Sequence, residues 1–207
     1  MEILTQKQKE QLSQVPEHKR WNEFKNLEYH QGLWLRFWNK IFKGGKDDTV
    51  LDFGCGSCWA WVVANALGYK NVINLDIDEE EVRTSFKRYT DIWNSTVVYW
   101  DGKTMPFEDD TFNAIVAKAS IMKLVQTGFE RQVSELCRIT KPGGVWYVAP
   151  IDMYKRFIAD LDSSGMHKKL QDKNITIHCW TWKPFEKEKA IARTLLRPIK
   201  NVLRKNG

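Results

Sequence analysis

Hydrophobic and polar positions along the chain repeat with two different periods, one typical of strands and one typical of helices. Short apolar runs with the composition of buried strands lie at 49–53, 71–77, 96–100, 113–120 and 145–150. Stretches with helical spacing lie between or after them, at 58–67, 79–93, 129–139 and 154–164. Strands that alternate with helices in this way predict a mostly parallel sheet with helices on both faces.

The pattern is less regular near the two ends. Residues 17–42 are rich in aromatic side chains and predict one or two helices, followed by the turn KGGKDD at 43–48. We expect core packing for Trp21, Trp34 and Trp38, or a wall over a binding site. KPGG at 141–144 predicts a sharp stop after a helix, and 175–182 predicts a strand paired with 167–171 through a turn.

Composition narrows the class of protein. The chain has 207 residues, 43% hydrophobic and 28% charged, which is ordinary for a globular protein with a full core. No apolar run is long enough to span a membrane, and the polar start MEILTQKQKEQ has no signal-peptide core. Four scattered cysteines suit a reducing compartment better than a disulfide framework. We therefore expect a cytoplasmic protein.

The stretch VLDFGCGSCWAW, 50–61, is the strongest candidate for chemistry. A zinc site needs about four ligands, and no second Cys-x-x-Cys or His pair stands at a useful spacing to join Cys55 and Cys58. A redox-active dithiol at a helix start stays open, as does the simpler interpretation of two small residues in a crowded turn. A dinucleotide loop would need glycine at 59, which is Trp59.

The remaining interpretation is a loop that offers backbone amides to a ligand at a strand end. Asp52 precedes Gly54 and Gly56, and a helix start follows, which favours a carboxylate. Asp76 ends the next strand 20 residues beyond Gly56, the usual place for a carboxylate that binds ribose hydroxyls. A ligand with one carboxylate, one ribose and no pyrophosphate suits this pattern.

Four motifs carry a family resemblance. VLDFGCGSC resembles the first motif and INLDID the second motif of class I S-adenosylmethionine-dependent methyltransferases. WDGKTMPFEDDTFNAIVA and ELCRITKPGGVWYV are similar to two further motifs of the branch that acts in ubiquinone and menaquinone biosynthesis. The motifs stand in family order over 49–150. The resemblance implies an α/β, Rossmann-like, doubly wound sheet of seven mostly parallel strands, or fewer at its C-terminal edge, with an N-terminal helical cap.

The resemblance also implies a cofactor, S-adenosyl-L-methionine, with S-adenosyl-L-homocysteine as the product. It places Asp52, Gly54 and Gly56 at the methionine end, Asp76 at the ribose, and Asp101 with Gly102 at the adenine edge. A short acid and a free amide after a strand also suit an exocyclic amine on chemical grounds. The implied cofactor-binding set further includes Cys55, Ile77 and Ala117.

Other interpretations stay open for individual acids: Asp52 could orient the loop, Asp78 could cap a helix, and Asp101 could form a turn. Departures from the family pattern are Cys58 for the third glycine, Trp59 after it, and Asn113 for the usual Asp. Methyl transfer needs alignment more than acid–base chemistry, so catalytic residues are hard to identify.

The catalytic candidates are His30 in the aromatic N-terminal stretch, and Lys118 and Lys123 at or beyond the fourth strand. His30 could instead pack or lie at the surface, and the lysines could be solvated or could bind an anionic substrate. No Asp/Asn-Pro-Pro-aromatic motif follows the fourth strand, where KAS stands. That counts against methylation of nucleobase amines.

We expect three segments: an N-terminal helical segment, 1–45, that covers the active site; a cofactor-binding domain, 46–185; and a basic amphipathic tail, 186–207. The leading hypothesis is a methyltransferase acting on O or N, less readily C, of a small molecule such as a lipid, quinone or sugar. A net charge of +6 and the tail keep open a membrane-surface or anionic partner, including RNA. An RNA or protein methyltransferase, or a non-catalytic partner subunit, are the alternatives.

Overall fold

The computed structural model describes residues 27–56, 58–80, 97–121, 124 and 128–180. Within these ranges the strands form one six-stranded sheet in the order β3-β2-β1-β4-β5-β6, with every neighbouring pair parallel. The strands are β1 (Val50–Phe53), β2 (Val72–Asp76), β3 (Val97–Tyr99), β4 (Phe112–Lys118), β5 (Thr140–Ala149) and β6 (Thr176–Cys179). This confirms the Rossmann-like doubly wound fold, with six strands among the described residues.

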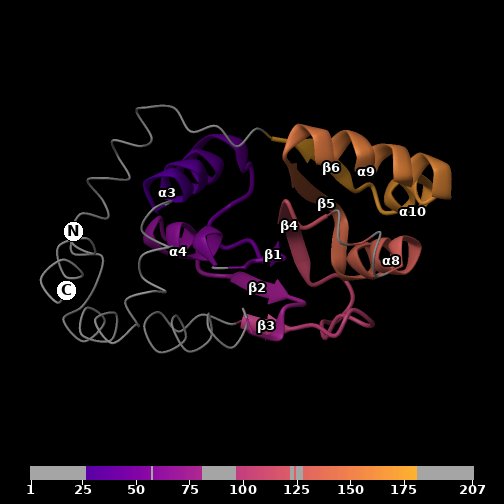
Figure 1. Ribbon diagram of the computed structural model, residues 1–207, viewed down its shortest axis with the longest axis horizontal. Helices are drawn as coiled ribbons and strands as arrows, with labels where there is room; N and C mark the ends of the chain where they lie inside the picture. Colours follow the sequence, from indigo (N-terminus) through magenta and orange to yellow (C-terminus); the bar gives the residue numbers. More distant parts are fainter. Residues whose placement is uncertain (1–26, 57, 81–96, 122–123, 125–127, 181–207) are drawn as a thin grey trace, which may run out of the picture.

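Helices lie on both sides of the sheet (Figure 1). On one side are α3 (Leu27–Arg36), the π-helix η1 (Phe37–Ile41) and α4 (Trp59–Ala66). On the other are α8 (Phe129–Ile139), α9 (Ile151–Ser164) and α10 (His167–Asp172). The chain order changes direction between β1 and β4, and in such sheets ligands bind beyond the carboxyl ends of the strands at that point.

Alternate residues of the central strands enter two separate hydrophobic cores. In β5, Tyr147 joins the core under α3 and α4, whereas Trp146 and Val148 join the core under α8 and α9. This division follows from the period of two in a strand. Because both faces are covered, the strands are almost continuously apolar, which is why their sequences read as unbroken runs.

The N-terminal aromatic residues within the described part are core residues. Trp34 and Trp38 are 4% and 2% exposed. Trp38 donates its indole N–H to the carbonyl of Ala60 at 2.9 Å, and its own carbonyl accepts from the Tyr69 hydroxyl at 3.1 Å. The packing role is confirmed for these two tryptophans, while Trp21 lies outside the described residues.

The C-terminal hairpin prediction is wrong. Residues 167–171 belong to the helix α10, and β6 pairs with β5 in parallel instead of with them. The buried Leu170 explains the difference, because one helical turn is enough to place it in the core beside α8 and α9. KPGG does follow α8, but it lies inside β5 as an irregularity, since the register jumps from the Phe112–Thr140 pair to the Ala114–Val145 pair.

Candidate cofactor site

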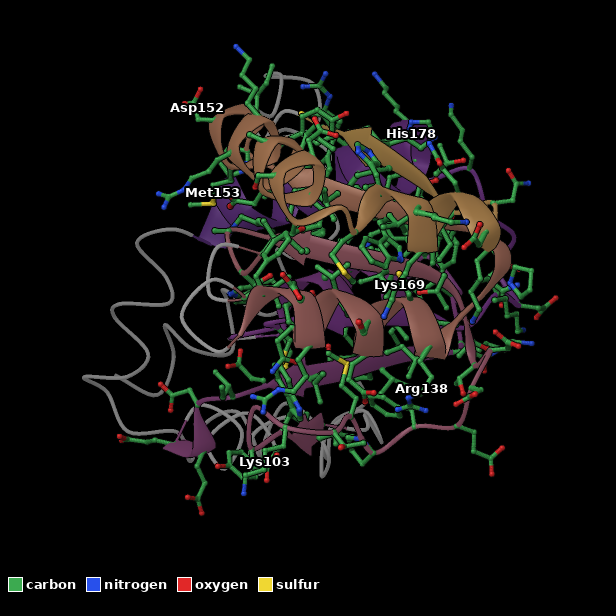
Figure 2. All side chains as sticks on the ribbon, turned by 90° about the vertical axis from the view of Figure 1, so that its right-hand side faces the viewer. Lys103, Arg138, Asp152, Met153, Lys169 and His178 are labelled. Atoms are coloured by element: carbon green, nitrogen blue, oxygen red, sulfur yellow. The ribbon has the colours of Figure 1, made fainter. Side chains whose placement is uncertain are left out.

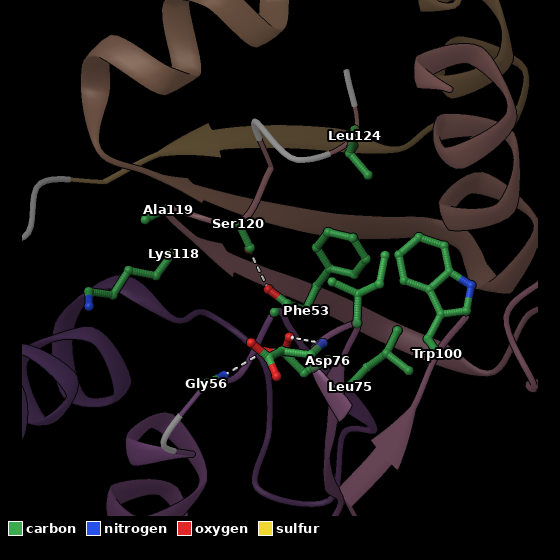
Figure 3. Close-up of a pocket in the computed structure, with 12 residues that line it drawn as sticks. Phe53, Gly56, Leu75, Asp76, Trp100, Lys118, Ala119, Ser120 and Leu124 are labelled. Atoms are coloured by element: carbon green, nitrogen blue, oxygen red, sulfur yellow. Dashed lines mark hydrogen bonds between the residues drawn. The ribbon is translucent and has the colours of Figure 1, made fainter. Parts of the chain in front are cut away.

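A cavity of about 250 Å³ opens at the carboxyl edge of the sheet. Its walls come from the ends of β1, β2 and β4 and from the residues that follow these strands and β3 (Figure 3). Phe53, Leu75, Trp100 and Leu124 form apolar walls, and Asp76 and Lys118 supply charge. In Figure 3, Lys118 lies at one end and Trp100 at the other. An elongated ligand with an apolar and a charged end suits this shape.

The glycine-rich loop after β1 is held against the end of β2. The amides of Gly54 and Cys55 both donate to the carbonyl of Leu75, at 2.8 and 3.1 Å. Gly54 has a φ of +70°, and a Cβ there would lie 2.2 Å from the Cβ of Ser120. Ser120 in turn donates its hydroxyl to the carbonyl of Phe53. Glycine is therefore required at 54 both by backbone angle and by the approach of the segment after β4.

The Asp76 carboxylate accepts hydrogen bonds from two backbone amides. Its Oδ2 accepts from the Gly56 amide at 2.8 Å and its Oδ1 accepts from the Asp78 amide at 3.0 Å (Figure 3). Each carboxylate oxygen has a further lone pair, so the side chain can still accept two hydroxyl donors from a ligand in the cavity. Asp78 itself accepts from the Glu80 amide at 3.0 Å, which confirms its role as a helix cap.

Asp52 is a buried acid next to this arrangement. It is 3% exposed, and its Oδ2 is buried with no hydrogen-bond partner among the described residues. Burial, and then the charge of Asp76, raise the pKa of the Asp52 carboxyl from 3.8 to about 7, while Lys118 opposes the shift. The pKa of Lys118 is lowered by burial, against the attraction of Asp52. A cation bound here would favour the ionised form of Asp52.

The structure brings together about half of the sequence-predicted cofactor residues. Gly54, Gly56, Asp76 and Ile77 line the cavity. The other five are absent from its lining: Asp52, Cys55, Asp101, Gly102 and Ala117. Ala117 is 1% exposed in the sheet, and the exposed Asp101 accepts from the amide of Lys103 at 2.9 Å. That contact has the form of a local turn.

Among the catalytic candidates, Lys118 lines the cavity. The backbone of His30 lies in α3, but the His30 side chain and all of Lys123 fall outside the described parts. Sequence reasoning missed the walls formed by Trp100, Ser120 and Leu124. Trp100 and Leu124 are apolar and buried, so nothing in the sequence separates them from ordinary core residues.

A second missed feature is a set of hydrogen bonds by which α8 holds the segment after β3. We call the α8 side chains that make them the clamp: Arg131, Gln132, Glu135 and Arg138. Arg138 donates to the carbonyls of Met105 and Phe107 at 3.0 and 2.8 Å and to Asp109 at 2.8 Å. It also pairs with Glu135 through two hydrogen bonds of 3.0 and 2.9 Å, and Glu135 accepts from the Met105 amide. In Figure 2, Arg138 projects from α8 toward the side of the molecule on which Lys103 lies.

The clamp extends to Gly102, whose carbonyl accepts from Arg131 at 2.9 Å and from the buried Gln132. Two of the four sequence motifs are therefore one physical unit, since ELCRI lies on α8 and DGKTMPFEDD is the segment it holds.

The departures from the family pattern leave the cavity open. Trp59 does not line it and packs against the core under α3 and α4. Asn113 accepts from the Thr49 amide and from Lys141, both at 3.1 Å, near the start of β4 and away from the cavity. Cys58 adopts a left-handed conformation with φ 54°, the backbone that glycine supplies in the family pattern.

Residues 51–148 match the family described as a methyltransferase domain. This assignment to a methyltransferase domain agrees with the class I S-adenosylmethionine-dependent family that the four motifs resemble. The four motifs imply S-adenosylmethionine as the cofactor of this methyltransferase domain. Its residues fit the cofactor, since Gly54 and Gly56 line the cavity without side chains, Asp76 can accept ribose hydroxyls, and the Oδ2 of the nearby Asp52 has no hydrogen-bond partner among the described residues.

One similar protein and one structure with the same fold accompany the family match. The methyltransferase domain is similar to demethylmenaquinone methyltransferase of Staphylococcus saprophyticus, at 26% identity over 128 residues. That alignment covers 61% of this chain and 54% of the relative, so the chain spans about half of its length. A crystal structure of a SAM-dependent methyltransferase from Aquifex aeolicus shares the fold, with a TM-score of 0.50 and 20% identity over 60% of this chain and 65% of that chain.

Two features are absent from the described residues. None of their helices combines the length and the apolar character needed to cross a membrane. They also contain no group of three or more His, Cys, Asp or Glu side chains placed to hold a metal ion.

Proposed function

We propose that this chain transfers the methyl group of S-adenosylmethionine to an oxygen or nitrogen atom of a small molecule, and less readily to carbon. The observation that carries the proposal is the Asp76 carboxylate, held by the Gly56 and Asp78 amides at the edge of a cavity inside a methyltransferase domain. The similar protein named for demethylmenaquinone favours a quinone-like ring over a lipid or sugar acceptor.

The cofactor supplies an electrophilic methyl group on a sulfonium, and this chain supplies position and charge. Asp76 would bind the ribose, and Phe53, Leu75 and Trp100 would provide an apolar surface for the adenine. Asp52, buried and outside the cavity lining, would attract the cationic methionine end through its charge, with Gly54 and Gly56 supplying bare backbone in the lining itself. Asp101, Gly102, Cys55, Ile77 and Ala117 remain proposed members of the same site.

Lys118 is the proposed base for a hydroxyl or ammonium acceptor. Burial lowers its pKa, so the neutral amine is more populated near neutral pH than it is for an exposed lysine. A neutral amine at the cavity end can accept the proton that the acceptor loses on methylation. A charged Lys118 would instead orient an anionic acceptor, and a pH profile of turnover separates the two roles.

Calorimetry with the full chain tests the cofactor site. Asp76→Asn should weaken S-adenosylmethionine binding by about 100-fold, because one carboxylate oxygen, an acceptor, is replaced by an amide NH2 group that can only donate. Asp172→Asn, on the exposed surface of α10, is the matched control and should leave affinity unchanged. Folded wild-type protein that does not bind the cofactor, or an Asp76→Asn variant with unchanged affinity, would overturn the proposal.

The acceptor class is tested with methyl-labelled cofactor and three cell fractions: small molecules, total RNA and protein. We expect label in the small-molecule fraction, with loss of kcat but not of cofactor affinity in Lys118→Met. Label that appears in RNA or protein instead would overturn the small-molecule proposal and support the macromolecular alternatives.

A further inference from the structure

Two thiols lie together in the loop that precedes α4. The sulfur atoms of Cys55 and Cys58 are 3.5 Å apart. Cys55 is partly exposed, while Cys58 is fully buried at the start of the helix. An accessible thiol followed by a buried one at a helix start is the arrangement in which a dithiol can be oxidised reversibly.

We propose that Cys55 and Cys58 form a reversible disulfide that weakens the binding of S-adenosylmethionine, so that the cofactor loop responds to the thiol redox state. The second half of this inference rests on the proposed cofactor site. The first half, formation of the disulfide, stands on the geometry of the loop alone.

The backbone already has a shape that a disulfide requires. The Cys58 amide donates to the Cys55 carbonyl at 2.9 Å, which closes a four-residue turn. Turns of this kind bring the terminal Cα atoms within about 7 Å, and disulfides span Cα separations of about 4.4–6.8 Å. Bond formation then requires the two sulfurs to approach from 3.5 Å to about 2.05 Å, a movement that local rotation of the loop can supply.

The chemical step is thiol–disulfide exchange with a small disulfide such as glutathione disulfide. The thiolate of the accessible Cys55 attacks one sulfur, forms a mixed disulfide and releases one glutathione thiolate. The thiolate of Cys58 then attacks the Cys55 sulfur and releases the second. The two protons lost by the cysteines end on the two glutathione thiols, and the dithiol loses the two electrons that the small disulfide gains.

Oxidation of the two thiols can alter the cofactor site through Gly56. The thiols of Cys55 and Cys58 lie 3.9 and 3.6 Å from the Gly56 carbonyl, as donors. The Gly56 amide holds the Asp76 carboxylate at 2.8 Å. Oxidation removes both S–H donors and draws the flanking chain together, so the residue that holds Asp76 must shift. Asp76 would then present its oxygens to a ribose in a different position.

The environment of Cys55 affects the rate and the persistence of the change. Its hydrogen bond with Cys58, followed by burial, raises the pKa of the Cys55 thiol well above its ordinary value. A small thiolate fraction makes oxidation slow at neutral pH. A thiol of high pKa is also a poor leaving group, so the disulfide should resist reduction once it has formed.

The disulfide is tested with the full chain equilibrated in glutathione buffers from fully reduced to fully oxidised. The protein is quenched in acid, unfolded in urea and labelled with a maleimide, and the mass of the labelled chain is measured by mass spectrometry. Reduced chain should take four adducts, one for each cysteine, and oxidised chain two. Peptide mapping should place the bond between Cys55 and Cys58. A chain that takes four adducts at every ratio would overturn the proposal.

Calorimetry with S-adenosylmethionine then compares the two forms. Oxidation should weaken binding about tenfold, within the usual range of coupling between two sites. In Cys58→Gly, which restores the third glycine at a position with φ 54°, affinity should no longer depend on glutathione. Cys179→Ser, at a partly exposed cysteine of β6, should behave as wild type.

The outcomes separate the two proposals. A disulfide that forms without changing affinity overturns the coupling and leaves the cofactor site intact. Reduced chain that does not bind the cofactor overturns the proposed function and the coupling with it, while the adduct count still decides whether the disulfide forms. Wild-type sensitivity that persists in Cys58→Gly would assign the effect to another cysteine and overturn the Cys55–Cys58 assignment.

Discussion

Two segments lie beyond the carboxyl ends of β1 and β3, the strands on either side of β2, and the protein holds them in different ways. The glycine loop after β1 is held by backbone amides that donate to Leu75 and Asp76. The segment after β3 is held from outside, by the guanidinium and amide side chains of α8. The loop whose own backbone faces the cavity is thus held by a few local contacts, whereas the other is fixed by a remote helix.

The sequence motifs therefore contain two kinds of residue: those that can bind a ligand and those that hold a segment of the protein in place. Beside the glycine loop, Asp52 has an oxygen without a partner among the described residues, and each Asp76 oxygen accepts one amide and keeps a further lone pair for a ligand. Arg138 and Glu135 are satisfied by each other and by the segment they hold. We infer that changes near the loop alter charge and ligand binding, whereas changes in the clamp alter stability first.

The largest expected effect is at Asp52. Because folding raises its pKa from 3.8 to about 7, the folded protein favours the protonated carboxyl. The stability that this group contributes is complete below pH 3.8 and is lost as pH rises to about 7. Asp52→Asn removes this titration. The difference in free energy of unfolding between the two proteins should therefore change by about 4 kcal/mol across that window, in favour of the variant at high pH.

Urea denaturation of both proteins at a series of pH values measures this difference. The other acids and bases titrate in both proteins, so their contributions cancel in the comparison. A difference that stays flat with pH would show that Asp52 is ionised in the folded protein at acidic pH. Bound cofactor should reduce the slope, because a cation beside Asp52 favours the carboxylate.

A smaller effect is expected from the clamp. Arg138→Lys keeps the charge but loses the planar fork that reaches Met105, Phe107 and Asp109 together. We expect a loss of about 2 kcal/mol in the free energy of unfolding. Cofactor affinity should fall only a few-fold, through displacement of the segment that includes Trp100 and Gly102. Urea denaturation and calorimetry on the same samples give both values.

Lys169→Met is the matched control, on α10 beside the same helix. Lys169 makes one exposed hydrogen bond to Ser134 at 2.8 Å, and its loss should change stability by less than about 0.5 kcal/mol. If the two variants lost similar stability, the clamp would be no stronger than an ordinary surface contact. If Arg138→Lys abolished cofactor binding without loss of stability, the contrast between the two segments would be wrong.

The sequence predicted the parts of this site that depend on local order. Alternating strands and helices predicted the parallel sheet, and Asp76, singled out by its 20-residue spacing from Gly56, lines the cavity. The cap at Asp78 followed from local chemistry in the same way. Each of these features is fixed by residues close in the chain or by the order of neighbouring strands.

The features that sequence reasoning missed depend on distant contacts. Arg138 and Met105 are 33 residues apart, and Ser120 meets the carbonyl of Phe53 across 67 residues. Trp100 lines the cavity, yet it is as apolar and as buried as any core residue. The helix α10 is another case, since its six residues are too few for periodicity to separate a helix from a strand.

The smallest expected effect is at Asn113, which stands where the family pattern has Asp. The Asn113 Oδ1 accepts from the Thr49 amide and from Lys141, so Asp would keep both contacts and add attraction to the lysine. We expect Asn113→Asp to stabilise the fold by less than about 1 kcal/mol, an increment that salt should reduce.

Asn113 lies five residues before Lys118 in β4, about 16 Å from the cavity edge along the strand, so cofactor affinity should not change. Urea denaturation at low and high salt, with calorimetry beside it, tests both parts. A threefold or greater change in affinity would mean that this departure reaches the cofactor site. An unchanged affinity would place Asn113 with Arg138, among motif residues that act on the fold and not on the ligand.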